Sequence, residues 1–371
     1  MRQGSQELIS TLSSTFEREL KVNVYNGTER VLEGESFESW QLESDLGAKV
    51  CSSGSGVLVH ESVHGESLSP VGTKGLLSPF RARVEPVLTI RDGDFEESVS
   101  LGMFRATGVP STSDSTVEFR GKEVVSASRV AMRFESLDED TRRWGFRAPE
   151  QSAAGASAFA EIRRLTGMPV EQNGVADVAI PALKTWEARR GSRLDAVLEI
   201  GRILGGSAVV NSRGAWVVIP DTVGEPVATL RLGELGTVLD VADEIDTDEV
   251  YNEVVGAFED ANGNPIRVVA EVKSGDLSVT GDYKPNTTYY SNDLVKTEDQ
   301  ARTAVQSILD LSTGSQVYDV QIQCHLNPLV EIGDVIKLEG WKRPLVGRLR
   351  RVSMSDSAYM NITLRVHREL T

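Results

Sequence analysis

Histidine and cysteine most often hold metals or act as nucleophiles, and here they occur at few useful spacings. His60 and His64 form the one i, i+4 pair. We expect two solvated loop histidines there, because the context is strand and turn and no third ligand is evident. Cys51 and Cys324 lie far apart and outside any CxxC pair. They therefore predict buried thiols rather than a disulfide framework or a zinc site.

Glycine-rich stretches offer no clear cofactor or cation loop. Gly54-Ser55-Gly56 starts like a dinucleotide-binding fingerprint but lacks the third glycine and leads into a strand, so it predicts a turn. No Gly-x-Ser-x-Gly nucleophile elbow occurs. In the 260–264 stretch the glycine comes too early for a calcium loop. We therefore predict no cofactor-binding, metal-binding or catalytic residues.

Carboxylates are abundant, and paired carboxylates could cleave glycosidic bonds. The formal net charge is -16, and residues 225–299 hold 17 acidic against five basic residues. A dense run within this segment comprises Asp240, Asp243, Glu244, Asp246 and Asp248. A charge run is usually a solvated face, so we name no glycosidase residues. The acidity also disfavours a nucleic-acid-binding surface, which needs Lys and Arg to neutralise phosphates.

The basic residues favour contacts to an acidic neighbour, and the tryptophans favour core or interface positions. One basic cluster comprises Lys342, Arg343, Arg348, Arg350 and Arg351. Salt bridges to an acidic neighbour are the more natural interpretation, with nucleic-acid binding as the alternative. The spacing of the tryptophans does not fit a platform on which bases or sugars stack, so we interpret them as core or interface anchors. They are Trp40, Trp144, Trp186, Trp216 and Trp341.

The stretch from Ser192 to Asp221 predicts a helix that runs into a β-hairpin. Ser192 has the residue type of an N-cap, and Asp195 follows at capping-box spacing. The helix should end at Gly205-Gly206, and two strands, 208–210 and 215–219, should flank the 212–214 turn. Upstream, residues 152–165 predict a helix closed by Gly167, and 175–180 predict a strand.

The two ends of the chain are dominated by strand and turn signals. Residues 5–20 predict a short amphipathic helix, and Asn26-Gly27 predicts the turn of a hairpin. Further strands are expected at 57–60, 83–90, 99–104, 117–119 and 123–126. Near the other end, Thr297 and Gln300 form a capping box ahead of a helix that should end near Thr313-Gly314. Strict alternation then predicts strands at 317–326, 335–338, 345–352 and 360–366.

These elements predict a mainly β chain with an α/β insert. We expect three domains: 1–135, a β domain with a leading helix; 136–224, a helix-hairpin α/β middle domain; and 225–371, an acidic β domain with one helix. The two outer domains should be small and barrel-like. No signal peptide and no membrane helix are expected, which favours folding in a cytoplasm.

Several stretches together resemble the hub or minor tail proteins of long-tailed bacteriophages, related to the late-control protein D hub family. They are Phe16-Glu17-Arg18-Glu19-Leu20, Leu77-Ser78-Pro79-Phe80, Leu101-Gly102-Met103-Phe104-Arg105, Ser192-Arg193-Leu194-Asp195-Ala196-Val197-Leu198, Gly214-Ala215-Trp216-Val217-Val218-Ile219-Pro220, Val250-Tyr251-Asn252-Glu253-Val254, Thr297-Glu298-Asp299-Gln300-Ala301 and Asn327-Pro328-Leu329-Val330-Glu331-Ile332-Gly333-Asp334-Val335. Their order spans most of the chain, and their order and spacing carry the resemblance.

The resemblance implies a structural protein of a siphophage-like virion, at the distal end of the tail. In that family a homotrimer forms a pseudo-sixfold ring matched to the hexameric distal tail protein. Tape measure protein and DNA pass through it, and other tip or fibre proteins attach. The chain has no recognisable lysozyme or peptidase extension, so we expect no enzyme activity. The alternative is an all-β cell-wall carbohydrate-binding or hydrolytic tail component, which an aromatic-lined cleft with two facing carboxylates would favour.

Overall fold

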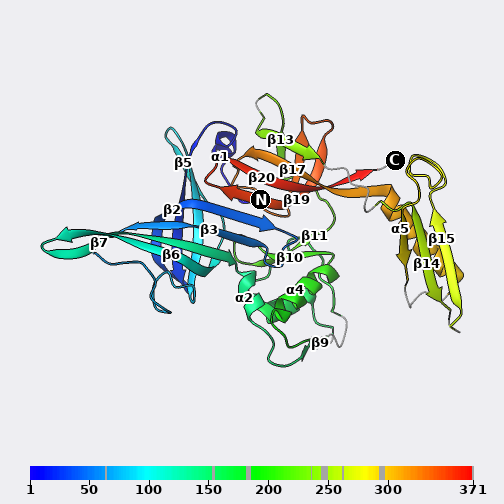
Figure 1. Ribbon diagram of the computed structural model, residues 1–371, viewed down its shortest axis with the longest axis horizontal. Coiled ribbons are helices and arrows are strands. Elements are labelled where there is room, and N and C mark those ends of the chain that lie inside the picture. The colour runs from blue at the N-terminus through cyan, green and yellow to red at the C-terminus, as the bar shows by residue number, and fades with distance from the viewer. Residues whose placement is uncertain are drawn as a thin grey trace. The chain divides into compact units, whose positions relative to one another are not determined.

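The computed structural model describes residues 1–62, 65–152, 155–180, 185–234, 236–243, 250–260, 263–291 and 297–369 (Figure 1). The chain divides into two compact units. Unit 1 comprises Met1–Val241 and Gln321–Leu364, and unit 2 comprises Ala242–Val320 and Arg365–Thr371. Most regular structure is β, with a few helices. This confirms the predicted fold class, while the division at residues 135 and 224 stays a prediction.

The first part of unit 1 is a closed antiparallel β-barrel, called barrel 1 here. Its strands pair in the order β1-β4-β6-β7-β3-β2, and β2 pairs back with β1 to close the cycle. Along β1, Leu20, Val22 and Val24 alternate into the core because successive side chains of a strand point to opposite faces. The elements are α1 (Gln6–Thr11), β1 (Glu17–Asn26), β2 (Glu29–Asp45), β3 (Ser52–Glu61), β4 (Ala82–Asp92), β5 (Phe95–Ser100), β6 (Phe104–Phe119) and β7 (Lys122–Ser136).

Two glycine residues of β3 determine how aromatic rings pack inside barrel 1. Gly54 and Gly56 lie within β3, where a Cβ would come 2.5 Å from the Phe134 ring and 2.3 Å from the Phe37 ring. The predicted turn at Gly54-Ser55-Gly56 is therefore wrong. These glycines make room for two aromatic rings in a strand.

A second barrel, barrel 2, uses strands from both sides of unit 2 in the sequence. Its strand order is β12-β18-β19-β20-β17-β13, and a bridge between Leu232 and Val238 links the two ends. The strands are β12 (Ala228–Arg231), β13 (Val238–Asp243), β17 (Ser315–His325), β18 (Val335–Glu339), β19 (Leu345–Ser355) and β20 (Tyr359–Glu369). The alternation predicted at the C-terminal end is confirmed, and Val320, Ile322 and Cys324 are buried.

Strand β2 belongs to both barrels. Its first half pairs with β1, whereas Gln41–Asp45 pair with β19 of barrel 2. The change of partner follows an irregularity in the β2–β3 register between Glu38 and Gln41, where Ser39 has a φ of 48°. Such a bulge bends a strand, so that one strand can serve two sheets.

The middle segment packs two helices against a hairpin. Its core includes Ile162, Leu194, Val197 and Trp216. The elements are α2 (Asp138–Arg143), β8 (Glu150–Gln151), α3 (Ala158–Thr166), β9 (Thr185–Trp186), α4 (Ser192–Ile203), β10 (Gly206–Val210) and β11 (Trp216–Pro220). The helix-hairpin prediction is confirmed, and Gly167 ends α3 in the left-handed conformation.

Unit 2 contains a small α/β layer. Its strands β14 (Glu253–Glu259), β15 (Pro265–Glu271) and β16 (Thr287–Tyr290) form one sheet, and α5 (Glu298–Gly314) packs on it through Ala301, Val305 and Leu309. The predicted capping box is confirmed, because Gln300 N–H donates to the Thr297 hydroxyl and the Gln300 side chain accepts from Thr297 N–H, both at 3.3 Å.

Some local boundaries differ from the sequence predictions. The first helix ends at Thr11, because residues from 17 onward pair with β4. The helix predicted for residues 152–165 is α3, which begins at Ala158 rather than at 152. The Ser157 hydroxyl caps its N-terminus. Residues 175–180 form an isolated bridge at Ala179 instead of a strand. The prediction of a single strand over residues 99–104 is also wrong. Strand β5 ends before Gly102 and β6 begins after it, and Gly102 has a φ of 122°.

The start of α4 also differs. The N-cap is Gly191, which has a φ of 78° and makes no side-chain cap bond. Ser192 is buried, and its hydroxyl donates to the carbonyl of Arg189 at 2.6 Å. Asp195 pairs with Lys49 and Arg189 instead of completing a capping box.

Candidate functional site at the barrel junction

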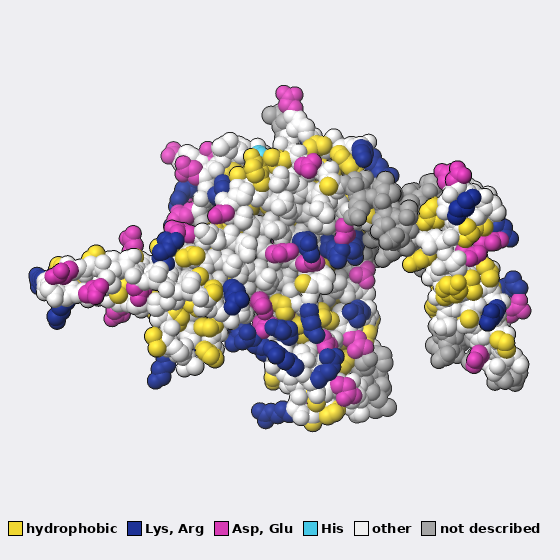
Figure 2. All heavy atoms as spheres, in the orientation of Figure 1, with side chains coloured by type: hydrophobic (Ala, Val, Ile, Leu, Met, Phe, Trp, Pro, Cys, Tyr) yellow, Lys and Arg dark blue, Asp and Glu magenta, His cyan; other side chains and the backbone are white. Residues whose placement is uncertain are grey.

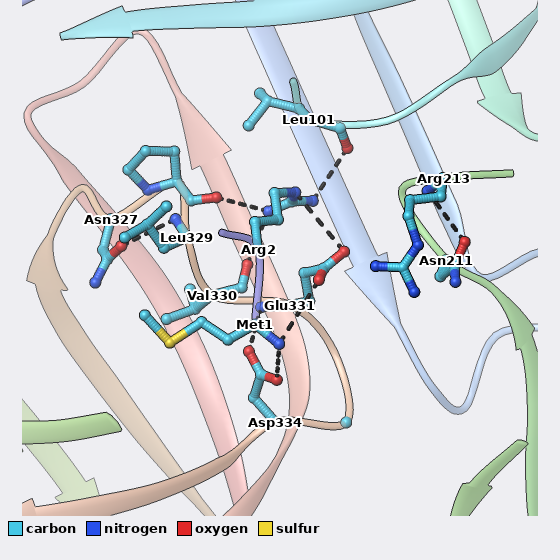
Figure 3. Close-up of polar contacts among 12 residues, drawn as sticks. Met1, Arg2, Leu101, Asn211, Arg213, Asn327, Leu329, Val330, Glu331 and Asp334 are labelled. Atoms are coloured by element: carbon cyan, nitrogen blue, oxygen red, sulfur yellow. Dashed lines mark hydrogen bonds and ion pairs between the residues drawn. The ribbon is translucent and has the colours of Figure 1, made fainter. Parts of the chain in front are cut away.

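The first residues of the chain join barrel 1 to barrel 2 (Figure 3). Arg2 Nη1 donates to the carbonyls of Pro328 at 2.7 Å and Val330 at 2.9 Å in barrel 2. Its Nη2 donates to the carbonyl of Leu101 in barrel 1 at 3.0 Å. One guanidinium thus satisfies three carbonyls from two barrels, which its fixed fork of donors makes possible.

Carboxylates from barrel 2 complete this network. The Met1 ammonium group pairs with Asp334, and Arg2 lies 3.7 Å from Glu331. Burial raises the pKa of Asp334, and the Met1 ammonium opposes that rise. Burial lowers the pKa of Arg2, while Glu331 and Asp334 act to raise it. The junction therefore holds charges that are paired with each other across distant parts of the sequence.

The shared strand supplies a second connection. Asp45 at the end of β2 lies opposite Arg351 of β19, and both Nε and Nη2 of Arg351 donate to Asp45 Oδ2, at 3.1 and 2.6 Å. Although burial raises the pKa of Asp45, the bonds from Arg351 and from Gly47 N–H lower it overall. Arg350 also lies 3.9 Å from Asp45. Two members of the basic cluster thus pair with an acidic neighbour, as predicted.

The middle segment meets both barrels at a cavity of about 270 Å³. Phe104 of barrel 1, Ile219 of β11 and Val330 of barrel 2 are among the residues that line it, as are the polar residues Asn211 and Arg213. Arg213 pairs with Glu171 through two nitrogens, which lower the pKa of that carboxyl. The cavity shows that three segments of the sequence converge at this junction.

Beside the cavity, Cys51 and Asp138 are buried together. Asp138 accepts from the Cys51 backbone N–H at 2.8 Å and from the Ser136 hydroxyl at 2.6 Å. Burial, aided by the Asp138 charge, raises the pKa of Cys51 to about 12. Burial alone raises the pKa of Cys324 to about 12. Both cysteines are free and buried, as predicted, and both remain protonated at neutral pH, where a thiol is a poor nucleophile.

A second cavity, of about 540 Å³, lies where α2 follows barrel 1. Glu139 is fully buried and receives hydrogen bonds from Arg142 and Arg143. Burial and the Glu139 charge raise the pKa of Glu135. Although burial raises the pKa of Glu139, its two arginine partners lower it overall. The two ion pairs of Glu139 lie within α2, and Arg142 also lies 3.8 Å from Glu135 at the end of β7, which links the helix to that strand.

The other candidate residues are placed as follows. The expected solvated loop histidine is wrong at His60, which lies in β3, is partly buried and has its Nδ1 2.9 Å from Glu35, because the strand continues through this position. His64 lies outside the described residues. In the acidic run, the side chain of Asp240 is exposed, whereas those of 243–248 lie outside the described part. Asp260 accepts from the Asn264 backbone in the β14–β15 turn. Among the described residues, no three His, Cys, Asp or Glu side chains are grouped to hold a metal ion.

Arg2 was not foreseen as a junction residue from the sequence, whereas Arg350 and Arg351 were singled out as members of the basic cluster. Arg2 binds carbonyls 326 and 328 positions away, and nothing in its local sequence signals those partners. Trp40, Trp186 and Trp216 are buried as predicted, but Trp144 is half-exposed with Arg193 4.0 Å above its ring. Among described helices, none has the length and apolar character needed to cross a membrane.

Comparison with known proteins identifies the fold. No family model and no curated protein matches the chain. The tail protein from Neisseria meningitidis MC58 has a TM-score of 0.55 at 14% identity, covering 94% of this chain and 97% of the other. The 43 kDa tail protein of prophage MuSo2 from Shewanella oneidensis has a TM-score of 0.54 at 11% identity, covering 93% and 98%. The chain therefore has the fold of phage tail proteins, which confirms the resemblance at the level of fold.

Proposed function

We propose that the chain is a structural hub protein of a phage tail tip or baseplate. Three copies form a ring that joins the end of the tail tube to tip proteins. The observation that carries the proposal is the pair of six-stranded barrels joined through β2, Arg2 and Asp45. Two barrels in each of three copies make six similar modules, which match the hexameric distal tail protein that the resemblance implies.

The proposed ring lies at the distal end of the virion tail after assembly in the host cytoplasm. Its partners are the distal tail protein, the tape measure protein and other tip or fibre proteins. DNA passes through without specific binding, because acidic residues from 225–299 line part of the lumen and repel phosphate. A pore wall made mainly of Lys and Arg would contradict this charge argument, even in a trimer.

Native mass spectrometry tests the ring directly. We expect monomers at low concentration and trimers at high concentration, because a ring closes once its interfaces are populated. Imaging of the virion should place the same trimer at the tail end. A monomer at every concentration, together with a particle that lacks the chain, would refute the proposal.

We also propose that the chain acts through its interfaces rather than by catalysis. Asp45 at the barrel junction, Asp138 beside the junction cavity and Glu139 in α2 all have structural partners. A hydrolase would need a pair of carboxyl groups positioned on either side of a substrate bond. Incubating the purified chain with peptidoglycan and with host polysaccharide tests this, and the release of soluble fragments would favour the hydrolytic alternative.

A further inference from the structure

The three-stranded sheet of unit 2 carries α5 on one side and presents its other side to solvent. Val254 and Val268 belong to the core that packs against α5, and Tyr290 lies against that core. Successive side chains of a strand point to opposite faces, so the alternate residues lie on the other side of the sheet. These residues, which we call the open face, are all exposed or half-buried: Glu253, Val255, Ala257, Glu259, Pro265, Arg267, Val269, Glu271, Thr287 and Tyr289.

An apolar row crosses the middle of the open face. Val255 of β14 is paired with Val269 of β15 and with Tyr289 of β16, which places the three side chains next to one another. Val269 is 56% exposed and Tyr289 is 79% exposed. Figure 2 shows hydrophobic side chains gathered on unit 2. Neighbouring exposed apolar side chains of this kind favour an interaction site.

The charge on the same face is mainly negative. Beside the apolar row, Glu253 lies directly opposite Glu271 in the β14–β15 register. Like charges at directly opposed positions weaken a strand pair, so a cationic partner would relieve that repulsion while covering the row next to it. Glu259 adds a third carboxylate, and Arg267 contributes one cation. Unit 2 as a whole holds 17 acidic and seven basic residues. The open face therefore fits a partner that is both apolar and positively charged.

A surface of that chemistry lies on unit 1, around α2 and the turn before α4, and we call it the arginine surface. Figure 2 shows Lys and Arg side chains gathered there. A Cβ added to Gly191 would lie 3.6 Å from Lys49 Nζ and 3.9 Å from Arg142 Cγ. One added to Gly145 would lie 3.2 Å from the Arg189 carbonyl oxygen, so these segments adjoin. The cations of this surface are Lys49, Arg133, Arg142, Arg143, Arg147, Arg189 and Arg190.

Part of this positive charge is not neutralised within the chain. Arg133, Arg147 and Arg190 are exposed and form no ion pair with any described residue. Arg133 shares the cavity of about 540 Å³ with Arg143, whose Nε donates to the fully buried Glu139. The carboxylates that are exposed or half-buried here are fewer than the cations, and they are Glu135, Asp140, Glu187 and Asp195. The arginine surface is therefore positive in a chain whose net charge is -16.

An aromatic side chain lies within the arginine surface. Trp144 directly follows Arg143 and is 51% exposed. The Arg193 guanidinium lies 4.0 Å from the centre of its ring. Because this contact holds the ring in place, little freedom is lost when a partner covers the exposed part. Tryptophan and arginine are also the residue types that contribute most at the centres of protein interfaces. The arginine surface thus has both properties that the open face requires.

We propose that the open face of one copy docks on the arginine surface of a second copy of this chain. Val269 and Tyr289 cover Trp144, while Glu253 and Glu271 lie against the arginines that have no ion pair within the chain. A second copy is the occupant because every chain supplies both complementary surfaces. The two surfaces differ, so the contact is head-to-tail and repeats until a ring closes. This inference rests on the proposed ring and identifies one of its contacts.

Two charge variants and their mixture test the contact. Val269→Lys with Glu271→Lys reverses the charge of the open face, and Arg133→Glu with Arg190→Glu reverses that of the arginine surface. Each variant alone should weaken self-association at least about tenfold in native mass spectrometry. Mixed in equal amounts, the two variants should form mixed oligomers, because the intact open face of one then meets the intact arginine surface of the other.

A neutral variant and two matched controls complete the test. Tyr289→Ser removes the exposed ring without adding charge, and it should weaken self-association about fivefold or more. Asp310→Lys changes an exposed carboxylate of α5, and Lys74→Glu reverses an exposed lysine of unit 1. Both controls should form the wild-type oligomer. Circular dichroism should show the wild-type fold in every variant, because each substitution is at an exposed side chain.

The outcomes separate this inference from the proposed ring. A wild-type trimer that both charge variants leave intact would refute the docking but keep the ring. Weakened association of each variant without mixed oligomers would show that the two surfaces do not meet between copies, which also refutes the docking.

A labelled single-stranded oligonucleotide tests the other possible occupant of the arginine surface. Binding that Arg133→Glu with Arg190→Glu abolishes, while self-association stays unchanged, would assign this surface to nucleic acid and refute the docking. A wild-type chain that stays monomeric at every concentration would contradict both the docking and the proposed ring.

Discussion

Barrel 1 and barrel 2 share an architecture but differ in how the chain builds it. Barrel 1 uses consecutive strands between residues 17 and 136, and all of its pairings are antiparallel. Barrel 2 takes strands from before and after most of unit 2, includes the parallel β12–β18 pair, and closes at a bridge. Closing a long loop costs more entropy than closing a hairpin, so barrel 2 depends more on long-range contacts.

This difference implies that the two barrels differ in stability. Barrel 1 contains three hairpins of strands adjacent in sequence, β1–β2, β2–β3 and β6–β7, while barrel 2 gains support from β2 and from the Arg2 network. We therefore expect barrel 2 to lose its structure first when either is weakened, because sub-global opening starts where long-range support is lost.

The largest effect should follow Ile322→Asp in β17. Ile322 is 2% exposed, and burying an unpaired carboxylate there should cost more than about 3 kcal/mol. Hydrogen exchange should show loss of protection in barrel 2 before barrel 1, and tail assembly should fail. Gln321→Asp, on the exposed face of the same strand, is the matched control. Normal tail assembly with Ile322→Asp would contradict the expectation that barrel 2 loses its structure first.

Gly56→Ala probes the packing of barrel 1. The new Cβ would come 2.3 Å from Phe37 Cε1, so we expect a loss of about 1–3 kcal/mol in the free energy of unfolding. Urea denaturation measures the loss, and adding Phe37→Leu should recover part of it. Gly224→Ala is the control, because a Cβ added there would meet no described atom within 4 Å beyond its chain neighbours. Equal losses in both variants would contradict the packing argument.

Arg2→Met should uncouple the barrels. It removes donors to Leu101, Pro328 and Val330, which should cost about 1–3 kcal/mol if their carbonyls stay buried. Thermal unfolding should then separate into two transitions, with barrel 2 melting first. Arg2→Lys, which keeps the charge but not the forked geometry, should give an intermediate loss. A single unchanged transition would show that β2 alone joins the barrels.

Asp45→Asn should have a smaller, pH-dependent effect. The folded state lowers the pKa of Asp45 below its ordinary 3.8, so ionised Asp45 contributes stability above that value. This contribution is lost as the pH falls through the folded-state pKa. At pH 7 the variant should lose about 1 kcal/mol, and the difference from wild type should vanish in strong acid. Asp92→Asn, at the exposed end of β4, is the control and should change the free energy of unfolding by less than about 0.5 kcal/mol at pH 7.

The smallest effect should come from Asp240→Asn. Asp240 is exposed in β13, and substitutions at such surface positions usually change stability by less than about 0.5 kcal/mol. Plaque assays should show infectivity near the wild-type level. A cell-wall-degrading activity of the purified chain that this substitution abolishes would overturn the structural proposal.

Local chemistry is sufficient to predict many elements. Strands 317–326 and 345–352 follow from alternation, the first hairpin from Asn26-Gly27, and the start of α5 from Thr297 and Gln300. The predicted first helix extends too far because apolar residues such as Leu20 fit both a helical stripe and the alternation of β1. Ser192 fits an N-cap by residue type, but the backbone conformation of Gly191 moves the cap by one residue.

The sequence by itself determined the mainly β class, the acidic segment and the helix-hairpin middle, because periodicity, turn residues and charge are local properties. The tertiary structure alone decided that β2 serves two barrels, that Arg2 joins them and that Gly56 makes room for Phe37. These features depend on which distant strands pair and in what register. Pairing between distant strands is selected by packing of the whole chain, and no local pattern encodes it.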